Sequence, residues 1–222
     1  MNFRALCQDL VKELGISGGT GPSTVLNQTG EYANVVRWIR DSALWIDNLW
    51  RDWKYLWVEY DGTLTGQSLT LPAVREVDRS SVWLNFGTAT ARNLKWVEWA
   101  TMRGYRAGVT QLGTPVKFSV DPAGVVWLDR PVTTQSVHLE YWKKPTTLVA
   151  DNDDPDLPEA YHRLILCRAA IMYGNREAAP EIISGMESEY IDLLEKLQSD
   201  QLETFRHERM SGQDIPLQLV YP

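Results

Sequence analysis

The sequence contains few of the residue types on which most catalytic and metal sites depend. Its 222 residues include only two cysteines and three histidines. A structural zinc site needs about four clustered ligands, and Cys7 and Cys167 are too few and too far apart for such a site or for a disulfide framework. We therefore interpret both cysteines as small core residues, and we expect neither a metal nor a cofactor.

The histidines also lack the neighbours that hydrolytic sites require. None of them accompanies a serine or cysteine in a known nucleophile motif, and no His-x-x-x-His pair is present. The glycine-rich stretch 15–21 has neither the Gly-Lys-Ser/Thr ending of a phosphate loop nor the preceding strand of a dinucleotide loop. These absences favour a protein that is not an enzyme.

Four aspartates are spaced like the first ligands of a calcium loop, but the rest of that loop is missing. Asp156 stands where the loop requires glycine, and His162 stands where it requires glutamate. We therefore interpret this acidic group as a solvated linker that also caps a helix. It consists of Asp151, Asp153, Asp154 and Asp156.

Long hydrophobic runs are absent as well. No stretch approaches the roughly 18 uninterrupted apolar residues of a membrane span, and the first fifteen residues form an amphipathic pattern without a signal-peptide core. We expect a protein that is made and kept in the cytoplasm, with no membrane association. A hydrophobic content of 44% and a charged content of 23% are typical of a folded chain with a packed core.

Basic residues are outnumbered, which argues against a general nucleic-acid binder. The net charge is −7, whereas such a protein usually presents a basic face. Residues 151–204 alone carry a net charge of −9, and the rest of the chain carries +2. The acidity therefore belongs to the C-terminal part, either as a solvated helix face or as a wall that repels DNA phosphates.

Apolar residues recur at helical spacing at both ends of the chain. The pattern predicts helices over 3–14 and over 28–54, the second with Thr29 as its N-cap. Trp38 and Trp45 fall beside the main apolar stripe, so this helix is expected to bury a second face against another lobe or another subunit. Further helices are expected after Asp156, an N-cap candidate followed by Pro158 in the first turn, and from Pro180 onward.

The middle of the chain, residues 55–146, is instead typical of short strands separated by turns. Turns are expected at Asp61-Gly62 and at 121–124, and Leu71-Pro72 is expected to start a strand or a corner. Because no helix-length crossover is evident, the strands are expected to pair antiparallel, in a small sandwich or barrel. The predicted strands are the runs LWVEY, SVWLNF, KWVEWA, VKFSV, GVVWL and SVHLEYW.

The predicted fold is therefore α+β. Residues 1–54 and 147–204 supply the helices of one bundle, and 55–146 form an inserted antiparallel β-sandwich-like lobe. Residues 205–222 form an extended C-terminal arm, whose apolar residues alternate at period two and end in Tyr221. Such an arm either adds a strand to a neighbouring chain or docks on its own domain. Its central residues are Ile215, Pro216, Leu217, Leu219 and Tyr221.

Ten tryptophans, all before Lys143, allow three interpretations. Each ring can belong to the core, to a protein interface, where tryptophan is enriched, or to a sugar-binding surface. The strand region holds the rings that a sugar-binding module would use, which are Trp83, Trp96, Trp99 and Trp127.

Several segments, in this order and spacing, resemble one known family. They are the loop TGPSTVLNQTGE at 20–31, the Trp-bearing helix after it, Leu71-Pro72, the strand end YWKKP at 141–145, and the acidic segment KKPTTLVADNDDPDLPEAYH at 143–162. Together they are similar to the head-to-tail adaptor proteins of tailed bacteriophages, which include the tail accessory factors of short-tailed phages and the connectors of long-tailed phages.

The resemblance implies a structural virion protein at the head-tail interface, present in the host cytoplasm during assembly. Such adaptors form a dodecameric ring beneath the portal, extend the channel for double-stranded DNA without binding it specifically, and carry a downstream tail or nozzle protein. The arm residues named above would reach the portal. Trp38 and Trp45 are candidates for a subunit or tail interface, and the candidates for the channel wall are Glu187, Glu189, Asp192 and Glu195.

Two other functions are considered. The tryptophans of the strand region allow a carbohydrate-binding or receptor-binding tail protein. Some relatives have been credited with cell-wall hydrolase activity, but this sequence offers no catalytic constellation for it.

Overall fold

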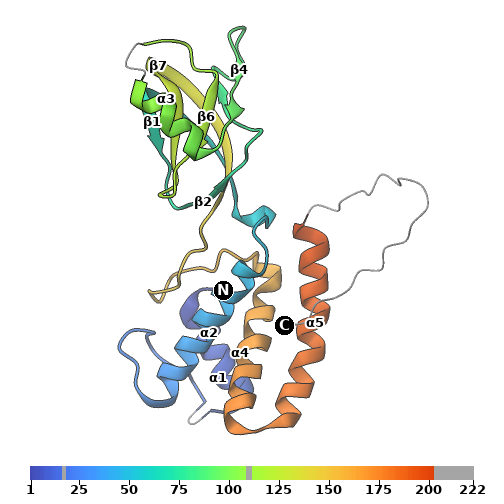
Figure 1. The fold of residues 1–222 in the computed structure, drawn as a ribbon. Coiled ribbons are helices and arrows are strands. Elements are labelled where there is room, and N and C mark those ends of the chain that lie inside the picture. Colours follow the sequence, from blue (N-terminus) through green and yellow to red (C-terminus); the bar gives the residue numbers. More distant parts are fainter. Residues whose placement is uncertain (17–18, 109–111, 203–222) are drawn as a thin grey trace, which may run out of the picture.

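The computed structural model describes residues 1–16, 19–108 and 112–202. These residues form two lobes with separate hydrophobic clusters (Figure 1). The helical lobe contains α1 (Phe3–Leu14), α2 (Gly30–Leu49), α4 (His162–Glu177) and α5 (Pro180–Gln201), and the sheet lobe contains α3 (Trp99–Gly108) and a mixed sheet. The predicted α+β class is confirmed. No helix among the described residues is long and apolar enough to cross a membrane.

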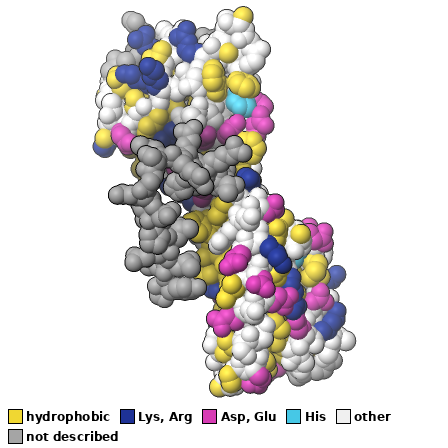
Figure 2. Space-filling view, turned by 90° about the vertical axis from the view of Figure 1, so that its right-hand side faces the viewer, with side chains coloured by type: hydrophobic (Ala, Val, Ile, Leu, Met, Phe, Trp, Pro, Cys, Tyr) yellow, Lys and Arg dark blue, Asp and Glu magenta, His cyan; other side chains and the backbone are white. Residues whose placement is uncertain are grey.

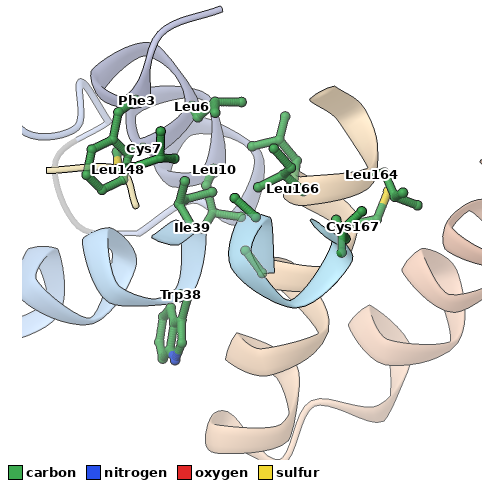
Figure 3. Close-up of a cluster of buried hydrophobic side chains, with 14 of the residues drawn as sticks. Phe3, Leu6, Cys7, Leu10, Trp38, Ile39, Leu148, Leu164, Leu166 and Cys167 are labelled. Atoms are coloured by element: carbon green, nitrogen blue, oxygen red, sulfur yellow. The ribbon is translucent and has the colours of Figure 1, made fainter. Parts of the chain in front are cut away.

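Helix α1 follows its sequence pattern closely. The Asn2 side chain accepts a hydrogen bond from Ala5 N at 2.9 Å, and Gly15 ends the helix with a φ of 64°, a conformation that glycine adopts without strain. Its apolar stripe packs against α2 and α4, as Figure 3 shows for Phe3, Leu6, Leu10 and Ile39. Cys7 and Cys167 lie in the same cluster, so their interpretation as core residues is confirmed.

Helix α2 is shorter than predicted. Thr29 occupies the N-cap position, but its side chain makes no capping hydrogen bond. The backbone becomes extended at Trp50, with φ −129° and ψ 146°. Trp53 then folds back onto the helix, is fully buried, and donates from Nε1 to the Ile46 carbonyl at 3.1 Å. The predicted continuation to residue 54 is wrong because Trp53 packs against α2 and does not extend it.

The C-terminal helices form a hairpin. Helix α5 begins at Pro180 as predicted. Gly174 of α4 allows the two helices to approach each other, since a Cβ there would lie 2.8 Å from Ile183 Cγ1. The expected N-cap at Asp156 is wrong, because the 3₁₀ turn η2 (Glu159–Tyr161) precedes α4 and the Asp156 carboxylate binds Thr146 N at 2.6 Å.

The sheet is built around one long strand. Strand β7 (Val125–Lys143) pairs antiparallel with β1 (Trp57–Thr70), β2 (Val74–Val77), β3 (Trp83–Leu84) and β6 (Lys117–Val120) along different parts of its length. Two predicted strands, GVVWL and SVHLEYW, are therefore parts of a single strand. The result is one curled, nearly barrel-like sheet (Figure 1), and the sandwich-like arrangement is not confirmed. Strand β4 (Arg92–Asn93) pairs with β3.

Two predictions for this lobe are wrong. Strand β5 (Lys95–Trp96) pairs parallel with β6, so the sheet is not purely antiparallel. Parallel strands need a long crossover, and α3 provides it. The sequence analysis missed this helix because its first two residues belong to the run KWVEWA, which was interpreted as a strand. The second error concerns Asp61-Gly62, which lies inside β1 and forms no turn. The Tyr60 ring lies over Gly62, so a Cβ at this position would displace the ring.

The other two predicted turns are present. Gly124 N donates to the Asp121 carbonyl at 2.9 Å in the turn before β7. Pro72 lies in the turn between β1 and β2, where Ala73 has a φ of 47°.

Candidate interaction surfaces

The acidic segment 143–162 connects parts of the chain that are distant in sequence. Asp151 Oδ1 accepts hydrogen bonds from Thr24 Oγ1 at 3.0 Å and from Val25 N at 2.6 Å. The backbone carbonyls of Asp151 and Asp153 accept from Arg4 N at 3.2 Å and Phe3 N at 2.8 Å, respectively. The segment thus fastens both the 20–29 loop and the start of α1.

The carboxylates of this segment bind different partners. Asp153 Oδ2 accepts from Val149 N and Ala150 N, both at 2.7 Å, and these hydrogen bonds lower the pKa of the carboxyl. The Asp156 carboxylate binds Thr146 N and the Lys143 ammonium instead. The segment is therefore a structural loop, and not the solvated, helix-capping linker that the sequence analysis expected.

Contacts of β2 with α2 join the two lobes. Arg75 Nη1 donates to the carbonyls of Asp47 at 3.1 Å and Trp50 at 3.4 Å. Carbonyls in the last turn of a helix have no partner within the helix, so Arg75 caps α2. An ion pair between Arg51 and Glu76, 3.1 Å long, lies beside this contact.

A buried carboxyl lies at the same junction. The Asp47 side chain accepts a hydrogen bond from Tyr55 Oη at 2.9 Å, and the residue is only 2% exposed. Burial raises the pKa of Asp47 to about 7, although the Tyr55 hydrogen bond opposes the shift. The junction therefore contains a group that titrates near neutral pH.

The two candidate interface tryptophans differ in exposure. Trp38 is 4% exposed and makes an edge-to-face contact with Tyr173 at 5.9 Å, from the side of α2 opposite Ile39 (Figure 3). The second face of α2 therefore packs, through Trp38, against α4 of the same chain. Trp45 is 38% exposed, and the Arg168 guanidinium lies 3.4 Å from its ring centroid. Only Trp45 retains surface for a partner.

The candidate channel residues on α5 divide in the same way. Glu187, Asp192 and Glu195 are exposed. Glu189 is half-buried and receives both Nε and Nη2 of Arg163, each at 2.9 Å. This bidentate pair lowers the pKa of Glu189, so Glu189 belongs to the contact between α4 and α5. On the face seen in Figure 2, acidic side chains are spread over the helical lobe, and several Lys and Arg side chains gather at the far end of the sheet lobe.

The four tryptophans considered for sugar binding are half-buried, and each has an aromatic or guanidinium partner. Arg106 lies 3.4 Å from the Trp127 centroid and 5.3 Å from that of Trp99. Arg79 lies 4.6 Å from the Trp96 centroid, and Trp83 contacts Phe86 edge-on at 5.8 Å. These partners occupy ring surface that a sugar would need.

One further group was missed by the sequence analysis. Glu59, Asp61 and His138 bring one ligand atom each to within 4.8 Å of one another. Strand pairing places Asp61 directly opposite His138, although 77 positions separate them in sequence. No sequence signal marks this pairing, since Asp61-Gly62 is typical of a turn.

Comparison with known protein families supplies the deciding observation. A family model described as SU10 adaptor protein matches residues 1–212, which include both lobes and the acidic segment. The chain belongs to the SU10 adaptor protein family. The resemblance to phage head-to-tail adaptors is thereby confirmed. A search of curated proteins finds no match.

Membership of the SU10 adaptor family assigns the chain to bacteriophage structural proteins and supports a role in the head-tail connection. It favours a protein without enzymatic activity. The predicted portal-binding residues, Ile215 to Tyr221, lie outside the described residues and beyond the matched range. The arm therefore stays a prediction from sequence.

Proposed function

We propose that this adaptor forms a dodecameric ring beneath the portal, joins the capsid vertex to the tail and extends the DNA channel. The family match over residues 1–212 carries the proposal, because it spans every helix and strand of the structure. Its partners are then further copies of the chain, the portal, and a downstream tail or nozzle protein. It would be found at the head-tail interface of the virion, and in the host cytoplasm during assembly.

The helical lobe offers residues for the contacts between subunits. Trp45 contacts Tyr190, with ring centroids 6.3 Å apart, and the next residue of α5, Ile191, is 44% exposed. Tryptophan and tyrosine are enriched at the energetic centres of protein interfaces. In a ring each subunit is held by two neighbours, so weak single contacts suffice.

The exposed acidic residues of α5 suit the wall of a DNA channel. Glu187, Asp192 and Glu195 make no ion pair with a described residue that would neutralise them. Like charge would keep phosphates from adhering while DNA passes. Arm residues Ile215, Pro216, Leu217, Leu219 and Tyr221 are proposed to attach the ring to the portal.

Native mass spectrometry of the chain, alone and with the portal from the same genome, tests this function. We expect a stoichiometric complex with twelve adaptor copies per portal ring. A ring that appears only with the portal also supports the proposal, since the portal can nucleate assembly. Absence of any association at low and at moderate salt would contradict it, and a glycan-binding assay on the sheet lobe would then follow.

A further inference from the structure

The outer face of the sheet lobe carries a cluster that the adaptor function does not use. Glu59 and Asp61 lie two positions apart in β1, so their side chains point to the same face of the sheet. Asp61 lies opposite His138 of β7 in the antiparallel ladder, so the imidazole is on that face too. His138 Nδ1 is 2.9 Å from Asp61 Oδ1 and 3.7 Å from Glu59 Oε1.

The imidazole is held in place by its neighbours. Its ring stacks on Phe86, with centroids 4.1 Å apart and planes inclined by 13°. Trp83, which contacts Phe86, is the ladder partner of His138 on its other side. The histidine side chain is 6% exposed, so Nδ1 is fixed toward the carboxylates and has little rotational freedom.

The carboxylates, in contrast, are open to solvent. The side chains of Asp61 and Glu59 are 73% and 54% exposed. An ion can therefore reach the site from outside, and the two carboxylates can adjust to it without disturbing the core. Imidazole nitrogen and carboxylate oxygen both serve as ligands of Zn²⁺ in proteins.

Charge and donor chemistry indicate the ligand. The two carboxylates together contribute a charge of −2, which a divalent cation neutralises. A set of one nitrogen and two oxygens is intermediate between imidazole-rich and all-oxygen sites, and suits Zn²⁺ and similar transition ions better than Ca²⁺ or Mg²⁺. We propose that Glu59, Asp61 and His138 form a binding site for a divalent transition-metal ion, with water completing the coordination.

The bound ion would connect β1 to β7 just before the pairing becomes irregular. The register shifts between Leu64 and Gly66 and again between Gly66 and Ser68. Because Phe86 packs on the ligating imidazole, the loop after β3 would be fixed as well. The ion would then act as a structural link on the lobe surface, and no catalytic role is needed.

The test uses the untagged full-length chain, freed of metal by a chelator and titrated with Zn²⁺ at pH 7.5 in a calorimeter. We expect one site per chain, with affinity reduced at least tenfold in Asp61→Asn and in Glu59→Gln. Glu98→Gln, at an exposed position of the same lobe, is the matched control and should bind as the parent does. Both changed ligands are exposed, so neither variant should unfold.

The two cysteines do not compete with the proposed site for the added Zn²⁺. The Cys7 and Cys167 side chains are fully buried in the helical lobe, so an ion in solution does not reach them. A thermal melt gives a second readout, because a ligand that binds the folded state raises Tm. The rise should be present in the parent and in Glu98→Gln and absent in Asp61→Asn. Absence of a one-to-one site in the parent, or equal binding by Asp61→Asn and Glu98→Gln, would overturn the proposal.

Discussion

Asp151 Oδ1 lies 3.0 Å from Thr24 Oγ1, although the two residues are 127 positions apart. The same oxygen binds Val25 N. Thr24 and Val25 belong to the 20–31 loop and Asp151 belongs to the 143–162 segment, two of the segments on which the family resemblance rests. These hydrogen bonds hold the two segments together next to α1.

Replacing Asp151 by alanine should therefore destabilise the fold. The change leaves the Val25 N–H without its acceptor, which costs roughly 1–3 kcal/mol. The free energy of unfolding, measured by urea denaturation, should fall by that amount. Asp154→Ala makes the same change of charge at an exposed neighbouring position and should have little effect. Equal effects of the two substitutions would show that the Asp151 contact contributes nothing specific.

The Asp47 carboxyl should make stability depend on pH near neutrality. Its pKa is about 7 in the folded protein, well above the ordinary aspartate pKa of 3.8. Between these values the folded protein keeps a proton that the unfolded chain releases, so the free energy of unfolding should fall as pH rises from about 4 to 7.

Asp47→Asn should remove this dependence, since an amide oxygen still accepts the Tyr55 hydrogen bond and no charge is buried. At pH 8 the variant should be more stable than the parent by roughly 2–4 kcal/mol. Urea denaturation at pH 5 and pH 8 measures the difference, with the exposed Asp52→Asn as the control. A parent and variant with parallel pH profiles would be inconsistent with a buried, titrating Asp47.

Much of the helical lobe could be predicted from sequence because its signals are local. The stripe of α1, the glycine after it and Pro180 each act within a few residues, and they mark the helix ends where the structure has them. The predictions were wrong where a contact with a more distant residue of the chain determines where a helix ends or what a side chain binds. Trp53 ends α2 by folding back onto it, and Asp156 binds Thr146 where helix capping was expected.

The sheet lobe was harder to predict for the same reason. Its strands were recognised from β-branched and aromatic runs, but their partners are far apart in sequence. The run KWVEWA contains both β5 and the start of α3, and nothing in its composition separates the two. The Asp61 to His138 pair depends on the β1–β7 register, which no local pattern specifies.

Trp38 and Trp45 should respond differently to replacement by alanine. Trp38 is buried, so its loss should cost about 3–5 kcal/mol of stability. Trp45 is partly exposed, so its loss should cost less and should mainly weaken assembly. Thermal melting measures the first effect, and native mass spectrometry with the portal measures the second. If Trp45→Ala assembles as well as the parent, the ring contact lies elsewhere.

The ion pair between Arg163 and Glu189 should stabilise the hairpin of α4 and α5 at neutral pH and should lose this effect in acid. The pair lowers the pKa of Glu189, so its stabilising contribution is present above the unfolded value of about 4.3 and is lost as pH falls through the folded value. Glu189→Gln should lower stability at pH 7 and have a smaller effect at pH 3. Glu187→Gln, at an exposed site two residues away, should change little at either pH.

Removing residues 213–222 should separate folding from portal attachment. The family match ends at residue 212, and described residues between 3 and 202 form the two hydrophobic clusters, so we expect the truncated chain to melt at the parent's temperature. Attachment to the portal should be lost, because the alternating residues Ile215, Leu217 and Leu219 are proposed to bind it. A full-length variant with these three residues changed to serine keeps the chain length and should fail in the same way. Truncated protein that still occupied portals fully would show that the attachment surface lies within the two lobes.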